Sequence, residues 1–491
     1  MSDILSKRRA GILLHITSLP GSGEHGDLGQ EAYHFVNFLH DAGVTVWQTL
    51  PLGMTHADGS PYQCLSAFAG NPALLGEDWL VTKGWLNLSS NGEDFAPQVL
   101  KSDLIVHSFA GFKAHADEHE KTLFEDFCQN EAFWLDDFSI FLALRHEFQE
   151  QSWHLWPEHF RERDEKAIKE ARRRLKAQIE IIKFEQYVFF RQWQALREYA
   201  NQKGVLLFGD IPIFVSYDSA DVWANRELFK LDEKGAMLVV AGVPPDYFSE
   251  TGQRWGNPHY DWNYLRKTGF HWWVERIHSQ LKMFDIVRID HFRGLEAAWE
   301  IPATEETAIN GEWVKAPGKA LLGAIKAQYG TVPLVAEDLG IITDEVVELR
   351  DEYDLPGMKI LQFAFGGGPD NPYLPNNFDK NCVVYTGTHD NDTTLGWSQK
   401  LSDQERHHVY EYLGNPSISI HCALIQAALA SVANLAVIPM QDILELDSEH
   451  RMNTPGTIEG NWKWRFQWEQ VTAERVGRLA YLIQLFNRNP Q

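Results

Sequence analysis

Arg288 and Asp290 stand two residues apart in a strand-like stretch near the middle of the chain. Residues 284–290 are rich in β-branched side chains, and Gly294 ends the run, so a strand is expected here. Side chains two apart on a strand point to the same face. A fixed guanidinium lowers the pKa of a neighbouring carboxyl and keeps it ionised, as a nucleophile requires. An Arg–Asp pair can equally be a structural ion pair, and this stretch alone does not decide between the two.

Further polar residues stand at the ends of other strand-like runs. These runs and residues are 205–210 with Asp210, 332–336 with Glu337, and 382–386 with His389 and Asp390. If the strands are parallel, their carboxyl ends meet at one face, and four carboxylates converge there. Four carboxylates at strand ends are hard to explain as scaffolding, so we predict a catalytic site.

The carboxylates differ in their surroundings. Glu337 has no cation beside it in sequence, and neighbouring anions with an apolar flank raise a carboxyl pKa, so it is predicted to be a proton donor at neutral pH. A nucleophilic Asp290 beside such an acid cleaves glycosidic bonds with retention. Asp390, with His389 beside it, is predicted to hold the hydroxyls of the distorted sugar. A divalent metal site is the competing use of clustered carboxylates. The interleaved Arg288, His291, Arg293 and His389 favour sugar hydroxyls over a cation.

The spacing of the apolar runs predicts how these residues are positioned. Eight strand-like runs alternate with helical stretches, which predicts an α/β fold, a (β/α)₈ TIM barrel. A doubly wound open sheet is the alternative, but no GxGxxG follows a strand. The predicted strands are 10–16, 45–50, 205–210, 284–290, 332–336, 358–363, 382–386 and 435–439, and predicted helices include 30–42, 185–200, 270–283, 321–327, 343–353 and 402–412.

We expect a single catalytic barrel over residues 1–491 with two insertions. Residues 73–184 are charged and helical, with a helix around 161–176, and are predicted to form an inserted helical subdomain. A second insertion, about 218–268, is predicted to carry an active-site loop at 240–258. Within that loop Tyr247 and Phe248 follow a stiff Pro-Pro pair and are predicted to act as a lid over the sugar. Ordinary loop packing is the alternative for these two rings.

The composition limits the classes of binding partner that we expect. The net charge of −24 repels nucleic acid and anionic membranes, so neither is expected as a partner. The 18 tryptophans fit either a Trp-rich core or a groove in which rings stack on sugars. The four cysteines form no CxxC pair, and free thiols in a cytoplasmic protein are the expectation. No apolar run is long enough for a membrane helix.

Long blocks around these residues resemble glycoside hydrolase family 77, the 4-α-glucanotransferases known as amylomaltases or disproportionating enzymes. The resemblance covers essentially the whole chain. Its blocks are 287–294 (VRIDHFRG), 335–340 (VAEDLG), 385–393 (YTGTHDNDT), 13–21 (LLHITSLPG), 60–63 (SPYQ), 209–215 (GDIPIFV), 243–249 (VPPDYFS), 253–258 (QRWGNP) and 451–457 (RMNTPGT).

The resemblance implies roles for individual residues. It makes Asp290 the nucleophile, Glu337 the general acid/base and Asp390 the stabiliser of the transition state. It places Asp210, Arg288, His291 and His389 around the donor sugar, with Tyr62, Trp255 and Asn461 as further glucan contacts. It implies α-1,4-glucans and maltooligosaccharides as substrates, glucose as an acceptor, and neither a cofactor nor a metal.

Some positions depart from the family pattern. Ile16 stands where proline is expected, Glu24 and His25 replace a more apolar pair, and His259 stands where leucine is commoner. None of these is a predicted catalytic group, so any difference is expected in acceptor preference. Two other functions remain open: a plain α-glucan hydrolase with the same carboxylates, and a glucan-binding scaffold without catalysis.

Overall fold

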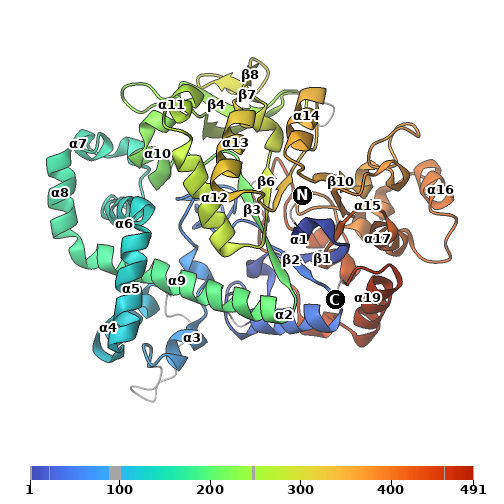
Figure 1. The fold of residues 1–491 in the computed structure, drawn as a ribbon, viewed down its shortest axis with the longest axis horizontal. Coiled ribbons are helices and arrows are strands. Elements are labelled where there is room, and N and C mark those ends of the chain that lie inside the picture. Colours follow the sequence, from blue (N-terminus) through green and yellow to red (C-terminus); the bar gives the residue numbers. More distant parts are fainter. Residues whose placement is uncertain (1–2, 22, 88–100, 246–248, 458, 490–491) are drawn as a thin grey trace.

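Eight parallel strands form the centre of the protein in the computed structural model, which describes residues 3–21, 23–87, 101–245, 249–457 and 459–489 (Figure 1). Their order in the sheet is β10-β11-β12-β1-β2-β3-β6-β9. The backbone N–H of Ala336 in β9 donates to the carbonyl of Pro356, next to β10, which brings the two end strands together. The bounds are β1 Arg9–Leu13, β2 Val46–Gln48, β3 Leu206–Pro212, β6 Ile286–Asp290, β9 Leu334–Ala336, β10 Gly357–Ile360, β11 Cys382–Tyr385 and β12 Leu435–Pro439.

All eight predicted strands are present, and the predicted (β/α)₈ barrel is confirmed. Several strands are shorter than predicted, and at two of them the chain turns into a 3₁₀ helix at the carboxyl end, at Ile16–Ser18 after β1 and at Leu361–Phe363 after β10. Short strands with tightly turned ends leave the following residues free to face the mouth of the barrel.

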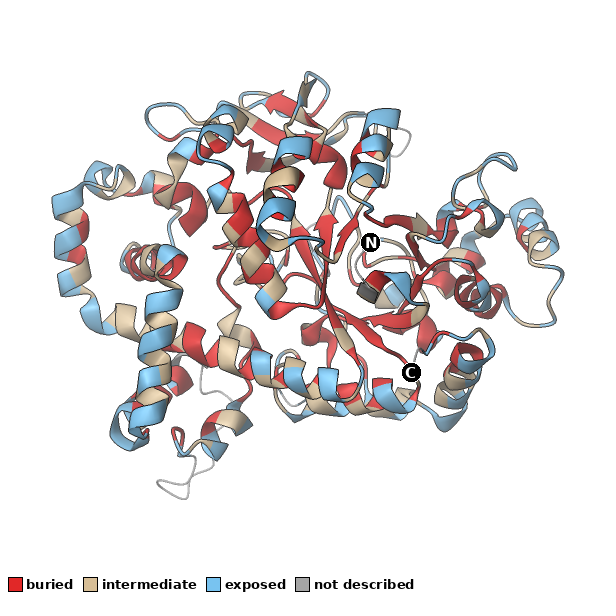
Figure 2. Ribbon diagram, in the orientation of Figure 1, coloured by how far each residue is buried: buried red, intermediate tan, exposed pale blue. Residues whose placement is uncertain are grey.

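The helices lie outside the strands, exposed on their outer faces and buried on their inner ones (Figure 2). Their bounds are α1 Asp3–Ser6, α2 Gln30–Asp41, α3 Glu77–Thr82, α4 Lys101–His115, α5 Glu118–Asn130, α6 Ala132–Glu147, α7 Glu158–Arg161, α8 Glu165–Arg174, α9 Lys176–Gln202, α10 Ala220–Ala224, α11 Trp262–Lys267, α12 His271–Met283, α13 Gly318–Tyr329, α14 Asp344–Glu352, α15 Thr394–Lys400, α16 Asp403–Tyr412, α17 Ile420–Ala430, α18 Met440–Ile443 and α19 Ala473–Leu485. No helix among the described residues is long and apolar enough to span a membrane.

Alternation along each strand divides the core into two layers. In β12, Leu435 and Val437 belong to one buried cluster, whereas Ala436 and Ile438 belong to another that includes the helices. The first cluster fills the barrel, because the Tyr385 hydroxyl of β11 reaches Gln48 of the non-adjacent β2 at 2.9 Å. Its strand residues are Leu13, Val46, Phe208, Ile286, Val335, Met358, Ile360, Val383, Tyr385, Leu435 and Val437.

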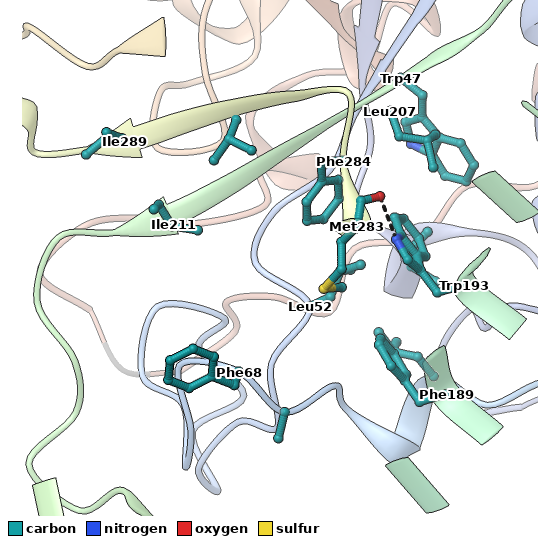
Figure 3. Close-up of a cluster of buried hydrophobic side chains, with 14 of the residues drawn as sticks. Trp47, Leu52, Phe68, Phe189, Trp193, Leu207, Ile211, Met283, Phe284 and Ile289 are labelled. Carbon is teal, nitrogen blue, oxygen red and sulfur yellow. Dashed lines mark hydrogen bonds between the residues drawn. The ribbon is translucent and has the colours of Figure 1, made fainter. Parts of the chain in front are cut away.

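Tryptophans hold the outer layer to the barrel (Figure 3). Trp193 of α9 lies against Phe284 at a ring-centroid distance of 5.3 Å, and its indole donates to the carbonyl of Met283 at 2.9 Å. The Phe284 ring also faces Gly209 of β3, where a Cβ would lie 2.3 Å from it, so only glycine fits there. Many of the tryptophans are therefore core residues, including the fully buried Trp47, Trp153, Trp156, Trp193, Trp223 and Trp273.

The region 73–184 contains helices α3 to α8, which lie together at one side of the barrel (Figure 1). Its predicted end at residue 184 falls inside α9, a single helix that packs against both α6 and β3. Because one continuous helix serves the helical region and the barrel, no linker marks a boundary there. The helix predicted around 161–176 is present as α8, which begins at Glu165 because Arg163, with a left-handed φ of 56°, separates it from α7.

A second, four-stranded antiparallel sheet lies beside the barrel mouth, in the order β5-β4-β7-β8. Its strands are β4 Val239–Val243, β5 Gln253–Pro258, β7 Ala297–Pro302 and β8 Glu312–Lys315. The prediction of a loop over 240–258 is therefore wrong at both ends, which are paired strands. Tyr247 and Phe248 lie outside the described residues.

Candidate active site

Strand register places the first group of site residues side by side. Asp210 of β3 is paired directly with Arg288 of β6, and Asp290 lies two residues further along. The Arg288 guanidinium donates from Nη1 to Asp210 at 2.6 Å and from Nη2 to Asp290 Oδ1 at 2.7 Å. One buried cation therefore holds two carboxylates, and it orients Asp290 toward the mouth while Asp210 is buried completely.

Glu337 comes directly after β9, the next strand around the barrel. Ile289 is paired with Ala336, and the backbone N–H of Glu337 donates to the carbonyl of Ile289 at 3.1 Å. Neighbouring parallel strands run about 4.8 Å apart, so this register brings Glu337 next to Asp290. The backbone N–H of His291 donates to Glu337 Oε2 at 2.7 Å. His291 has a left-handed φ of 55°, and the turn it makes aims this N–H at the carboxylate.

Burial and charge separate the pKa values of these two carboxyls. Burial raises the pKa of Glu337 to about 8, against the opposing charge of Arg288. Burial also raises the pKa of Asp290 to about 6, although Arg288 pulls it down. The expectation that Arg288 would lower the pKa of Asp290 below its ordinary value is therefore wrong, because desolvation outweighs the ion pair. Near neutral pH the arrangement still leaves Asp290 largely ionised and Glu337 protonated, as predicted for Glu337.

Asp390 lies in the loop after β11 and is held by side chains rather than by strand register. Asn453 Nδ2 donates to its Oδ1 at 2.7 Å, and His389 Nε2 lies 3.2 Å from the same oxygen. The surrounding protein desolvates Asp390, but His389 and Asn453 outweigh this effect and lower its pKa to about 2. Arg451 donates to its backbone carbonyl at 2.8 Å. Asp390 is thus a fixed anion.

Aromatic rings line the space between these groups. The Tyr62 hydroxyl donates to Asp210 Oδ2 at 2.8 Å, and its ring stacks on His389 with centroids 5.1 Å apart. Trp462 lies 6.0 Å from both rings. On the other side Trp255 of β5 meets the His291 ring edge-to-face at 4.8 Å, so the small sheet contributes to the site.

Asn461 lies at the edge of this region and is engaged within its own loop. Its carbonyl oxygen accepts from the backbone N–H of Thr454 at 2.9 Å, and its amide donates to Thr457. Together with His15 and Trp462 it lines a cleft of about 600 Å³ that is open to solvent. None of the four carboxylates lines this cleft, which is connected to them through Trp462 beside Tyr62 and His389.

Asn453, Arg451 and Trp462 are site residues to which the sequence analysis assigned no role. Asn453 reaches Asp390 from 63 residues away in the chain. The block 451–457, which contains Arg451 and Asn453, resembles the family pattern and so indicated a functional segment. Nothing in its composition indicated that Asn453 contacts Asp390.

Most of the predicted site residues that the structure describes fall into two connected groups; Trp255 reaches them through His291, and Asn461 is bonded within its own loop. Asp210, Arg288, Asp290, Glu337 and His291 are connected through β3, β6 and β9, and Tyr62, His389 and Asp390 join them through Asp210 and the loop after β11. Among the described residues one group of side chains could hold a metal ion, His421, Cys422 and Glu445, and it includes none of these carboxylates.

Comparison with known proteins gives consistent matches along the chain. The family model described as 4-alpha-glucanotransferase, glycoside hydrolase family 77, matches residues 14–472. The 4-alpha-glucanotransferase of Synechocystis sp. is 48% identical over 99% of both chains, and that of Thermus thermophilus is 47% identical over 98% of this chain and 99% of its own. An amylomaltase from Streptococcus agalactiae, solved in complex with acarbose, superposes with a TM-score of 0.94 at 37% identity, covering 99% of this chain and 100% of its own. This chain therefore belongs to the 4-alpha-glucanotransferases of glycoside hydrolase family 77.

Proposed function

We propose that this enzyme moves a segment of an α-1,4-glucan to the 4-hydroxyl of glucose or of another glucan, by a double displacement that retains the α linkage. The observation that carries the proposal is the pair on β6 and β9: an ionised Asp290 beside a protonated Glu337. A nucleophile and an acid on adjacent strands are what a retaining glycosyl transfer requires.

In the first step, Asp290 attacks the anomeric carbon of the donor glucan while Glu337 protonates the departing glycosidic oxygen. Arg288 fixes the Oδ1 atom of Asp290, which leaves its other oxygen as the attacking atom. The donor's non-reducing part stays attached to Asp290, and the remainder of the chain leaves with the proton.

In the second step, Glu337 is ionised and acts as a base. It takes the proton from the 4-hydroxyl of an incoming glucose or glucan, whose oxygen attacks the anomeric carbon and releases Asp290. The N–H groups of His291 and Leu339 each donate to a Glu337 oxygen, at 2.7 and 3.1 Å, and support the carboxylate in this ionised state. The proton taken from the acceptor hydroxyl returns Glu337 to the acid form for the next cycle, and the burial that raises its pKa keeps it protonated.

Asp390 is proposed to stabilise the positive charge that develops on the sugar ring between the two steps. An anion with a pKa of about 2 stays charged throughout the pH range in which the pair works. Its contacts with Asn453 and His389 hold it before substrate arrives, so little reorganisation is needed during the reaction. Tyr62, His389, Trp255 and Asn461 are proposed as glucan contacts around it. Asp210, predicted to lie around the donor sugar, is buried completely and is proposed to position Arg288 and Tyr62.

Transfer competes with hydrolysis, because water can attack the same intermediate. We propose that the segment between β4 and β5 shields it, with Tyr247 and Phe248 as the covering rings. The supporting observation is that both flanking strands are anchored in the small sheet, which already brings Trp255 against His291. An α-glucan hydrolase with the same carboxylates is the alternative function.

Incubation with maltotriose, without added metal or phosphate, separates the alternatives. Transfer yields glucose together with a ladder of longer maltooligosaccharides, and Asp290→Asn abolishes both. Maltose and glucose without longer products would identify a hydrolase. Binding of maltotriose with no reaction would leave only a glucan-binding scaffold. Replacing Tyr247 and Phe248 together with alanine is expected to increase glucose release relative to chain redistribution.

The proposed setting is the cytoplasm, without nucleic acid or membrane as a partner. Its support is the net charge of −24 and the absence of a disulfide among the four cysteines, all of which the structure describes.

A further inference from the structure

A second cluster of reactive side chains lies outside the glucan site, between α17, α18 and α19. A ring nitrogen of His421, the sulfur of Cys422 and a carboxylate oxygen of Glu445 lie within 4.8 Å of one another. Arg478 of α19 donates from Nη1 to Cys422 Sγ at 2.9 Å. The cluster opens into a small hollow of about 30 Å³, which is also lined by Arg475 and Asp442 and by the apolar residues Ile425, Ile443, Leu479 and Leu482.

We propose that Cys422 is a thiolate that hydrogen peroxide oxidises to a sulfenic acid in this hollow. Neither the proposed transfer reaction nor the family resemblance assigns a role to Cys422. Cys422 stands in the first turn of α17, an 11-residue helix whose N-cap residue, Ser419, makes no side-chain capping hydrogen bond. The unpaired N–H groups of such a turn, an arginine in contact with the sulfur and a neighbouring histidine all favour the thiolate over the thiol.

The charged groups around the sulfur come from each element that packs against it. Arg478 on α19 contacts Sγ directly, and Arg475, one turn earlier, lies 3.8 Å from Glu445. Glu445 and Asp442 carry the opposing negative charge, and Asp442 is committed elsewhere because it accepts three hydrogen bonds from Thr386 and Thr394. The balance lowers the pKa of Cys422: burial raises it, but His421, Ser419 and Arg478 more than compensate.

A metal ion is the competing occupant, since histidine, cysteine and glutamate are all zinc ligands. The two arginines argue against it. The guanidinium of Arg478 lies against the sulfur that a cation would have to bind, and Arg475 faces the carboxylate. The buried Nδ1 of His421, the residue before Cys422, has no hydrogen-bond partner, so the cluster keeps one unused polar atom.

Hydrogen peroxide is the only oxidant that this reaction needs. The sulfur of the thiolate attacks one peroxide oxygen, an S–O bond forms and the O–O bond breaks. Sulfur is oxidised, the peroxide is reduced, and hydroxide leaves and takes up a proton to become water. Cys422 is only 6% exposed, so a molecule as small as hydrogen peroxide is favoured over a bulky disulfide.

The other three cysteines are matched controls within the same chain. Burial raises the pKa of Cys64 to about 12, of Cys128 to about 11 and of Cys382 to about 12. Cys64 and Cys128 are both more exposed than Cys422. Reactivity that follows exposure would therefore select Cys64 or Cys128, whereas reactivity that follows thiolate character selects Cys422.

The test exposes the full-length protein to hydrogen peroxide at pH 7 for set times, then removes the peroxide and unfolds the protein in dimedone, and quantifies the adduct on each cysteine by peptide mass spectrometry. The expected result is an adduct that forms on Cys422 about tenfold faster than on the other three cysteines. Arg478→Gln is expected to slow labelling of Cys422 about tenfold, while Arg475→Gln, which removes the same charge without touching the sulfur, changes it less than about twofold.

Two further measurements make the test independent of how the variants fold. In the unaltered protein, oxidation of Cys422 by hydrogen peroxide is expected to reach half its maximal rate below pH 8.5, the ordinary thiol pKa. Faster labelling of Cys64 or Cys128, or an inflection above that pH, would overturn the proposal. Stoichiometric binding of Zn²⁺ that is lost in Cys422→Ser would also overturn it and assign the cluster to a metal.

Discussion

The two ends of strand β6 carry the same pair of residue types and use them differently. Asp285 comes just before the strand and is bonded to Arg197 at 2.8 Å, and Asp290 ends the strand and is bonded to Arg288 at 2.7 Å. Asp285 also accepts from the backbone N–H of Leu207, so both of its oxygens are occupied, and its side chain is 8% exposed. Among the described contacts Asp290 has one donor, Arg288, and it is 30% exposed.

This difference shows what separates a structural ion pair from a reactive one. Asp285 has no free oxygen and no access to a ligand, and it lies at the amino-terminal end of the barrel, where polar residues serve stability. Asp290 keeps one oxygen available at the carboxyl-terminal end. The ambiguity of an Arg–Asp pair in the sequence is therefore resolved by counting donors and by the end of the strand on which the pair lies.

The largest predicted contrast is between Asp290→Asn and Asp285→Asn. Loss of the nucleophile should reduce transfer by about 10⁴-fold or more, with unfolding in urea little changed. Asp285→Asn removes a buried hydrogen-bonded charge, so it should lower the free energy of unfolding by about 1–3 kcal/mol while kcat stays within about twofold. Maltotriose disproportionation and urea titrations measure both. Equal losses of activity in the two variants would refute the distinction between the two ends.

Glu337→Gln should reduce transfer by about 10²–10⁴-fold and remove one limb of the pH profile. Transfer needs Asp290 ionised and Glu337 protonated. With pKa values of about 6 and about 8, the rate should fall below pH 6 as Asp290 gains a proton and above pH 8 as Glu337 loses its own. Glutamine does not titrate, so the decline above pH 8 should disappear. A basic limb that persists in Glu337→Gln would assign it to another group.

Asn453→Ala tests the carboxylate that is held by a loop. Without the amide at 2.7 Å, Asp390 loses a donor to its charged form, so its pKa should rise and its position should loosen. Transfer should fall about 10–100-fold. The matched control is Thr457→Ala, which alters the same loop but not the Asp390 contact, and it should reduce the rate less. If both changes have the same effect, the loop as a whole acts, not the Asn453 contact.

The smallest effect is expected from Asp210→Asn. Asp210 shares Arg288 with Asp290, and its negative charge raises the pKa of Asp290. Removing that charge should lower the pKa of Asp290, so the decline in rate at low pH should move below pH 6. The maximal rate should fall about tenfold, because Arg288 loses one of its two anchors. An acidic limb that moves upward instead would show that Asp210 does not act through this charge.

Much of the barrel could be predicted because its strands are short buried runs between helices. The pair Arg288–Asp290 and the position of Glu337 after its strand needed only strand alternation and the barrel rule. The small sheet could not be predicted, because the exposed and mixed residues of β5 carry no alternating pattern, and β4 pairs with β7 from about 60 residues away.

The pKa shifts in the site depend on contacts between segments that lie far apart in the sequence, and the spacing of residues does not reveal these contacts. The pKa of Glu337 could be predicted because its cause, burial without a local cation, is visible in the flanking residues. The opposite shift of Asp390 could not, because Asn453 reaches it from a distant segment. For Asp290, the neighbouring Arg288 was predicted correctly, but the direction of the pKa shift was not. The sequence does not show how strongly the barrel desolvates this carboxyl.

The most direct test is to trap the covalent intermediate in Glu337→Gln with an α-maltosyl fluoride donor. Fluoride leaves without a proton, so the first step needs the nucleophile but not the acid, while the second step lacks its base. Intact-protein and peptide mass spectrometry should then find a maltosyl group on Asp290, and Asp290→Asn should show none. A maltosyl group on Asp390, or fluoride release with no covalent species in either variant, would contradict the account.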